Sequence, residues 1–231
     1  MKILIIVPAY NEEESLAGVI RDLREHVPSA DVVVVNDGSR DSTSLVAREL
    51  GVKVLDLPFN LGIGGAVQAG YLHARRNGYD IAVQFDGDGQ HRAGEIKKLI
   101  EPLATDQADL VIGSRFLVSG GYKAPVFRKL GIGIFSFVLS RVLDITVTDS
   151  TSGFRAANRG VIEFFARTYP DDYPEVESLV LLHKVNLRMT EVAVSMSERT
   201  GGRSSITPLR SVYYMTKVLM AIFIDLMKKV R

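Results

Sequence analysis

Residues 81–89 read IAVQFDGDG, an apolar run that leads directly into two aspartates separated by one glycine. The run at 81–85 predicts a buried strand, and the glycines after it predict a loop. Two carboxylates one residue apart in an extended loop can face the same hard cation, and glycine lets a ligand come close to the backbone. Asp86 and Asp88 therefore predict a Mg²⁺ or Mn²⁺ site, where the metal would bridge a diphosphate and stabilise its charge. A plain surface turn stays open as the alternative, because Asp-Gly pairs are common turn residues.

Outward from this stretch, strand-like and helix-like segments alternate along the chain. Short apolar runs predict strands at 3–7, 31–35, 52–57, 81–85, 110–114 and, further on, 191–196. Apolar residues at helical spacing predict helices at 12–26, 42–50, 64–77 and 94–103. This order predicts an α/β fold with a largely parallel sheet that helices cover on both faces. Ligands of such sheets bind beyond the carboxyl ends of the strands.

Two more acidic clusters stand at predicted strand ends. Tyr10-Asn11-Glu12 follows the first strand, and Asn36-Asp37-Gly38 follows the second. Taken alone, Glu12 is compatible with a favourable charge in the first turn of a helix and Asp37 with an Asx-turn. Three acidic clusters on one edge of one sheet favour a shared site, because unrelated turns should fall on both edges.

A glycine-rich segment, NLGIGG at 60–65, precedes the helix predicted at 64–77. It lacks the lysine and the hydroxyl residue of a P-loop, so it is a weak phosphate signal. Close packing of that helix on the sheet is the preferred explanation of its glycines.

Three arginines are candidate phosphate ligands, since the planar guanidinium matches phosphate oxygens well. Arg115 follows the strand at 110–114, and Arg128 begins an apolar helical stretch at 126–145. Arg199 lies in a glycine-containing segment that is expected to be a mobile loop closing over a ligand. Each of the three is also compatible with an ordinary solvent-exposed cation.

Composition narrows the class of protein. The chain has 231 residues, 46% hydrophobic and 24% charged, which is typical of one sizeable globular domain with a real core. A formal net charge of +1 argues against a nucleic-acid-binding protein. The absence of cysteine excludes disulfides, thiolate metal sites and a cysteine nucleophile, and it fits a cytosolic chain.

No uncharged apolar stretch approaches the roughly 18 residues that are needed to cross a bilayer. The apolar run at 3–7 is too short for a signal peptide and is interpreted as a strand. Two helical stretches, 126–145 and 208–230, are rich in large apolar residues and carry cations at their ends. Such helices suit the plane of a membrane surface, although packing on the core or a dimer interface would use the same residues.

Five motifs carry a resemblance to a known family: PAYNE at 8–12, NDGS at 36–39, DGDGQH at 86–91, GSR at 113–115 and SGFR at 152–155. In this order they resemble the family 2 glycosyltransferases over nearly the whole chain, most of all the branch with dolichyl-phosphate mannose synthase and bacterial polyprenyl-phosphate sugar synthases. The resemblance implies the GT-A fold, a Rossmann-like nucleotide-sugar-binding architecture, with a UDP- or GDP-sugar donor and a divalent metal. We expect one GT-A domain at 1–206 and a C-terminal amphipathic helix at 207–231.

The resemblance also implies roles for individual residues. The nucleotide would be held by Pro8, Tyr10, Glu12 and Asp37. Asp86 and Asp88 would serve the metal and the diphosphate, and Gln90 would lie near the sugar. The acceptor phosphate or the donor diphosphate would be contacted by Arg115, Arg128 and Arg199. The mannose synthases have Gly-x-Ser-Lys where residues 202–205 read GRSS, which leaves Arg203 as a substitute for the lysine and leaves the donor sugar open.

The function predicted on this basis is inverting transfer of a sugar to a dolichyl or undecaprenyl phosphate, by a cytoplasmic protein peripherally bound to the inner face of the membrane. A phosphate monoester is already anionic, so the enzyme must position and screen two anions rather than supply a strong base. Asp149 would be the base if the acceptor were a sugar hydroxyl; otherwise it would orient Arg155 or start a helix.

Alternatives in other classes stay open. One is a family 2 enzyme that glycosylates a saccharide hydroxyl in cell-surface polysaccharide synthesis, and another is a non-catalytic nucleotide-sugar-binding protein. The intact Asp86 and Asp88 argue against the second, since a binding protein needs no metal for a leaving group. A nucleotidyltransferase would need a basic, glycine-rich N-terminal loop, which 8–12 is not. Some relatives continue into transmembrane helices, so a small integral membrane partner is a hypothesis; a homo-oligomer is another.

Overall fold

The computed structural model describes residues 1–117, 133, 136–137, 139–141, 146–171, 174–197 and 220. Arg128, Arg199 and Arg203 lie outside these residues, as do most of 126–145 and all of 207–231 except Met220. The predicted membrane helices and the predicted domain boundary therefore stay predictions. Within the described ranges, every helix is too short or too polar to span a bilayer.

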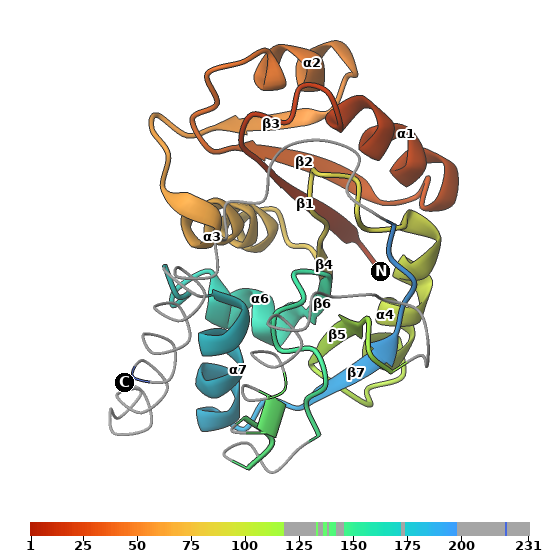
Figure 1. Cartoon of the computed structure of the whole chain (residues 1–231), viewed down its shortest axis with the longest axis vertical. Helices are drawn as coiled ribbons and strands as arrows, with labels where there is room; N and C mark the ends of the chain where they lie inside the picture. Colours follow the sequence, from red (N-terminus) through yellow and green to blue (C-terminus); the bar gives the residue numbers. More distant parts are fainter. Residues whose placement is uncertain are drawn as a thin grey trace.

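A seven-stranded sheet forms the centre of the molecule (Figure 1), with the strand order β3-β2-β1-β4-β6-β5-β7. Its strands are β1 (Ile3–Ala9), β2 (Asp31–Asn36), β3 (Lys53–Asp56), β4 (Ile81–Gln84), β5 (Leu110–Ser114), β6 (Arg155–Asn158) and β7 (Met189–Ala193). All neighbouring strands are parallel except β6, which is antiparallel to both β4 and β5. The largely parallel sheet predicted from the order of elements is confirmed.

Helices cover both faces of the sheet, as the continuous apolar strands require. They are α1 (Leu16–His26), α2 (Thr43–Glu49), α3 (Gly62–Arg76), the 3₁₀ turn η1 (Ala93–Glu95), α4 (Ile96–Ala104), α6 (Arg159–Phe165) and α7 (Pro174–Lys184). Side chains of α1, α2 and α4 share one buried core with Ile5 and Val7 of β1. Side chains of α3, α6 and α7 share the other core with Leu4 and Ile6. Alternate residues of β1 thus belong to two separate cores, one on each face of the sheet.

The first helix begins at Leu16 instead of residue 12. Asn11 has a positive φ of 56°, and the backbone N–H groups of Ser15 and Leu16 both donate to the carbonyl of Glu12, at 3.2 and 3.0 Å. Residues 12–15 therefore form a turn, which keeps the Glu12 side chain at the end of β1 and off the helix.

Three elements were not predicted, namely β6, α6 and α7. β6 reads RAAN and has no β-branched residue, so its sequence carries little strand signal. Its position between β4 and β5 nevertheless decides how the second half of the chain joins the first. The strand predicted at 191–196 is shifted, since β7 spans Met189–Ala193 and only an isolated bridge from Met196 to His91 follows it.

The glycines at 60–65 were expected to let α3 pack closely on the sheet, but the close contact with the sheet is made further along the helix, at Gly70. A Cβ on Gly70 would lie 2.3 Å from Cγ2 of Ile6, so this glycine lets the helix approach the sheet. A Cβ on Gly64 would lie 2.3 Å from the carbonyl oxygen of Pro170, so this glycine fits the helix against the segment before α7 instead of the sheet.

Candidate active site

The carboxyl ends of three adjacent parallel strands meet at one edge of the sheet, because β1 pairs with both β2 and β4. A cavity of ≈ 350 Å³ opens there. It is lined by Pro8, Ala9, Tyr10, Glu12, Asp37, Asn60, Gly62, Ile63, Ala66, Asp86, Gly87 and Asp88. Six residues predicted for the nucleotide and the metal therefore lie around one hollow.

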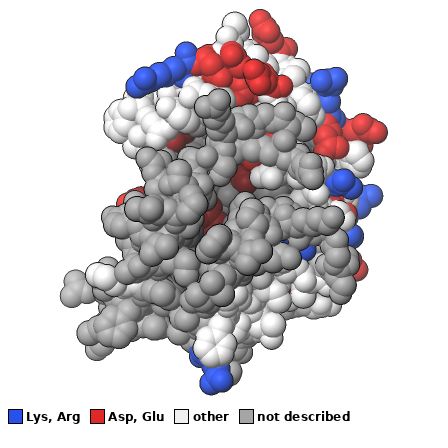
Figure 2. Space-filling view, in the orientation of Figure 1, with Lys and Arg blue, Asp and Glu red and all other residues white. Residues whose placement is uncertain are grey.

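The cavity is strongly acidic. Four carboxylates line it, from Glu12, Asp37, Asp86 and Asp88, and none of the described lining residues is lysine or arginine. In the space-filling view, acidic side chains also gather at the end of the molecule that carries α1 and α2 (Figure 2). An anionic ligand such as a diphosphate would be repelled here unless a cation accompanied it.

Asp37 fixes one wall of the cavity. Its carboxylate accepts the backbone N–H of Leu61 at 2.7 Å and of Gly62 at 2.9 Å, where α3 begins. A carboxylate at this place satisfies two helix N–H groups and interacts favourably with the helix dipole. Burial raises the pKa of Asp37, and these two hydrogen bonds act in the opposite direction. The Asx-turn considered for Asp37 is not observed, because its carboxylate binds the start of α3; the side chain of its neighbour Asn36 caps this loop instead, with Oδ1 accepting the Ser39 N–H at 3.1 Å.

The loop after β4 is held by a buried histidine. His91 Nδ1 accepts the backbone N–H of Asp86 at 3.0 Å, which places the ring proton on Nε2, 3.5 Å from Asp86 Oδ2. The ring stacks on Phe154 with centroids 4.6 Å apart. Burial lowers the pKa of His91, against the opposing effect of Asp86 and Asp88. The histidine is thus a neutral support beneath the Asp86 backbone.

The residues present fit a divalent metal that a bound phosphate would help to hold. In the described part of the chain no three His, Asp or Glu side chains gather into a complete metal cage. Mg²⁺ and similar hard cations are commonly bound by one or two carboxylates together with phosphate oxygens and water. Asp86 and Asp88 supply two carboxylates at the cavity, and the Asp86 side chain is 34% exposed.

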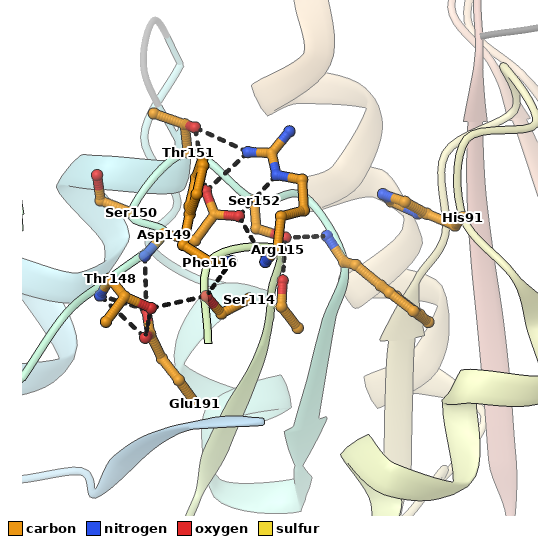
Figure 3. Close-up of polar contacts among 12 residues, drawn as sticks. His91, Ser114, Arg115, Phe116, Thr148, Asp149, Ser150, Thr151, Ser152 and Glu191 are labelled. Carbon is orange, nitrogen blue, oxygen red and sulfur yellow. Dashed lines mark hydrogen bonds and ion pairs between the residues drawn. The ribbon is translucent and has the colours of Figure 1, made fainter. Parts of the chain in front are cut away.

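Arg115 and Asp149 form a buried pair beside this edge (Figure 3). Arg115 donates from Nε to Asp149 Oδ2 at 2.6 Å and from Nη2 to Asp149 Oδ1 at 2.7 Å. The backbone N–H of Arg115 donates to the same carboxylate at 3.1 Å, and Nη2 also reaches Thr151 Oγ1 at 3.1 Å. Bidentate pairing of this kind fixes the plane of the guanidinium.

Asp149 does not orient Arg155, which was the structural role considered for it. Arg155 is buried and donates to the carbonyls of Ser150, Ser152 and Glu175 and to the Ser178 hydroxyl. Two of these acceptors, the carbonyls of Ser150 and Ser152, belong to the serine-rich turn that precedes Arg155.

Glu191 is a further member of the Arg115 network that the sequence did not single out (Figure 3). It lies on β7 and accepts backbone N–H groups of Thr148 and Asp149 at 2.9 to 3.0 Å. Its partners are more than 40 residues away in the chain, so no local pattern marks it. His91 belongs to the DGDGQH motif at 86–91, but the contacts by which it supports the loop form only when the loop is folded.

The remaining predicted residues lie outside the cavity lining. Gln90 is half-buried, and its backbone N–H donates to Asp88 Oδ1 at 3.0 Å. Arg115 and Asp149 lie after β5 and before β6, at the same sheet edge. The Gln90 carbonyl accepts the Ser197 N–H at 2.8 Å, so the segment that precedes Arg199 in the chain is tied to the Asp88 loop.

Residues 4–165 match the family described as glycosyl transferase family 2. The chain belongs to this family. The undecaprenyl-phosphate mannosyltransferase of Micrococcus luteus is 35% identical, over 90% of this chain and 88% of that protein. A UDP-N-acetylglucosamine–dolichyl-phosphate N-acetylglucosaminyltransferase of Methanococcus voltae is 32% identical, over 83% of this chain and 84% of the relative. The polyprenol monophosphomannose synthase of Mycolicibacterium smegmatis is 30% identical, over 88% of this chain and 80% of that synthase.

Solved structures of the same architecture confirm the predicted GT-A fold. Glucosyl-3-phosphoglycerate synthase from Mycobacterium tuberculosis, in complex with Mn²⁺, UDP and phosphoglyceric acid, superposes with a TM-score of 0.74. The match covers 97% of this chain and 78% of that one at 21% sequence identity, so the likeness is one of fold.

Proposed function

We propose that this family 2 glycosyltransferase transfers one sugar, with inversion, from a UDP- or GDP-sugar to a polyprenyl phosphate. The observation that carries the proposal is the acidic cavity at the ends of β1, β2 and β4, with Asp86 and Asp88 among its lining residues. The relatives add the acceptor class, since the names of three of them specify a polyprenyl or dolichyl carrier.

The nucleotide would lie against Pro8, Tyr10, Glu12 and Asp37, which line the cavity. Asp86 and Asp88 would hold Mg²⁺ or Mn²⁺, which when bound would neutralise the diphosphate as the glycosidic oxygen departs. Mn²⁺ and UDP occur together in the structurally similar glucosyl-3-phosphoglycerate synthase. Gln90, next to Asp88, would approach the sugar.

The charge of the phosphate acceptor indicates how it would react. One oxygen of a phosphate monoester attacks the anomeric carbon, a new C–O bond forms opposite the departing nucleoside diphosphate, and configuration inverts. The attacking oxygen is already anionic at neutral pH, so the reaction needs positioning and screening of charge. Both oxygens of Asp149 are bonded to Arg115 and its side chain is fully buried, which favours a reaction without this residue as base. Arg115, Arg128, Arg199 and Arg203 would supply positive charge to the phosphoryl groups.

The site of action would be the inner membrane face. The apolar stretches at 126–145 and 207–231 would lie in the membrane surface and bring the carrier lipid to the cavity. A small integral membrane partner or a second copy of the chain would reinforce this attachment.

A panel of UDP- and GDP-sugars, incubated with Mg²⁺ or Mn²⁺ and a short polyprenyl phosphate in detergent, tests the proposal. One donor should give a lipid-linked sugar, and a chelator should stop the reaction. Asp88→Ala should lower the rate at least about a hundredfold, because charge on the leaving group would no longer be screened. Asp80→Ala is the matched control, since Asp80 accepts the Lys2 backbone N–H at the amino end of β4, on the opposite edge of the sheet. If no donor is consumed with the lipid phosphate but one is consumed with a saccharide, the proposed acceptor is wrong.

A further inference from the structure

Glu191 connects the last strand of the sheet to the segment that carries Asp149. It lies on β7 opposite Ile112 of β5, in parallel register. Its Oε1 accepts the backbone N–H groups of Thr148 and Asp149, both at 3.0 Å. Its Oε2 accepts the Thr148 N–H at 2.9 Å and the Thr148 hydroxyl at 2.5 Å. Three donors from two consecutive residues thus converge on one carboxylate.

The hydrogen bonds around Thr148 have a defined direction. The single hydroxyl proton of Thr148 goes to the Glu191 carboxylate, which has none to give when ionised. Ser114 Oγ, 2.6 Å from Thr148 Oγ1, must therefore donate to it, and Ser114 Oγ in turn accepts the Phe116 N–H at 3.2 Å. The chain of donors runs from the end of β5 to Glu191 (Figure 3).

This chain and the Arg115–Asp149 pair join the same two segments. Ser114 and Phe116 flank Arg115, and Thr148 precedes Asp149. Glu191 therefore sets the position of the Asp149 backbone directly and that of the Arg115 backbone through Ser114 and Thr148. Because Arg115 is only 8% exposed and is held by two bonds of 2.6 and 2.7 Å, a small displacement of Asp149 changes where the guanidinium points.

We propose that Glu191 is a positioning residue for Arg115, which it holds in register with the phosphoryl group through Thr148 and Asp149. Only the assignment of Arg115 to a phosphoryl group rests on the proposed function. A carboxylate is needed because all the groups that face it are donors. In Glu191→Gln, one oxygen becomes an NH₂ group, so a Thr148 donor would face another donor.

The first test reads the Arg115–Asp149 bond without any substrate. Hydrogen exchange of arginine Nε–H groups is followed by ¹H–¹⁵N NMR, and the Arg115 signal is the one missing in Arg115→Lys. In Glu191→Gln this signal should exchange about tenfold faster than in the wild type, since the bond to Asp149 opens more often. Glu163→Gln is the matched control on the exposed face of α6 and should leave the signal unchanged. Equal protection in the wild type and Glu191→Gln would overturn the proposal.

Thr148→Val provides a second variant in case Glu191→Gln does not fold. It removes the hydroxyl link between Ser114 and Glu191 while the backbone N–H bonds stay. We expect faster exchange of the Arg115 signal in this variant too, by less than in Glu191→Gln. Unchanged exchange in a folded Thr148→Val would contradict the directed chain of donors.

The second test is a double-mutant cycle on transfer. Glu191→Gln should lower kcat about tenfold with little change in the donor KM, because the cavity for the nucleotide is intact. In the Arg115→Lys background, Glu191→Gln should lower kcat almost no further, since its effect passes through Arg115. An equal loss in both backgrounds would show that Glu191 acts independently of Arg115. If the wild type transfers no sugar at all, the proposed function fails, and the exchange experiment still decides the role of Glu191.

Discussion

Both carboxylate oxygens of Asp149 accept hydrogen bonds from the guanidinium of Arg115, at 2.6 and 2.7 Å, although the two residues lie 34 positions apart. The side chains are 0% and 8% exposed respectively, so water does not compete for these bonds. The pair ties the end of β5 to the segment before β6. A cation held in this way keeps one orientation at the edge of the sheet where the proposed donor binds.

Removing the charge of Asp149 should destabilise the fold strongly. Asp149→Asn leaves Arg115 buried without its counter-charge, and breaking a buried pair on one side costs about 3 to 5 kcal/mol. Urea denaturation measures the loss. Glu163→Gln breaks an exposed pair with Arg167, whose atoms lie 3.6 Å apart, and should change the free energy of unfolding by less than about 0.5 kcal/mol. Similar losses in the two variants would mean that solvent screens the Asp149 pair after all.

Replacement of a helical glycine by alanine should destabilise the protein at one position and stabilise it at another. Gly70→Ala on α3 places a Cβ 2.3 Å from Ile6 Cγ2, so overpacking should cost about 1 to 3 kcal/mol. Gly18→Ala on α1 meets nothing within 4 Å, and the higher helix propensity of alanine should stabilise the protein by about 0.5 to 1 kcal/mol. Thermal denaturation of both variants checks the pair. Equal changes in thermal stability in the two variants would show that α3 does not pack closely on β1.

The buried His91 should make the fold sensitive to mild acid. Because burial lowers the folded-state pKa of His91, its contribution to stability is fully present above the unfolded pKa of about 6.5 and is lost as pH falls below that value. The free energy of unfolding, measured without divalent metal, should therefore decrease from about pH 7.5 to about pH 5.5. His91→Gln should flatten this dependence in part. Part of the pH dependence should remain in this variant, since burial and the nearby Lys53 and Lys2 also lower the pKa of His73. An unchanged slope in His91→Gln would rule out this source.

The sequence was most informative where one element carries a strong local pattern. β5 was predicted with its observed bounds, because Leu110–Ser114 is a compact run between polar segments. The site around Glu12, Asp37 and Asp88 could be predicted because parallel strands place their carboxyl ends at a common edge. That inference needs only the order of elements and no knowledge of side-chain contacts.

Contacts between distant segments could not be predicted in the same way. Orienting the nearby Arg155 is one of the roles that the sequence suggests for Asp149, whereas its partner in the structure, Arg115, follows a strand that ends at Ser114. Glu191 stands in a strand whose residues are all half-buried, so its pattern does not show which side meets Thr148. Both contacts join the segment before β6 to residues in or directly after other strands, and the sequence of β6 itself carries little strand propensity.

The most direct test of the central claim compares two acceptors that differ only in the phosphate. The wild-type protein, a divalent metal and the productive nucleotide-sugar are incubated with a polyprenyl phosphate or with the corresponding polyprenol, and the lipid product is quantified. We predict a lipid-linked sugar from the phosphate and none from the alcohol, because only the phosphate is anionic without a base. Glycosylation of the polyprenol, or of a saccharide, at a rate equal to or above that of the phosphate would contradict the proposed reaction.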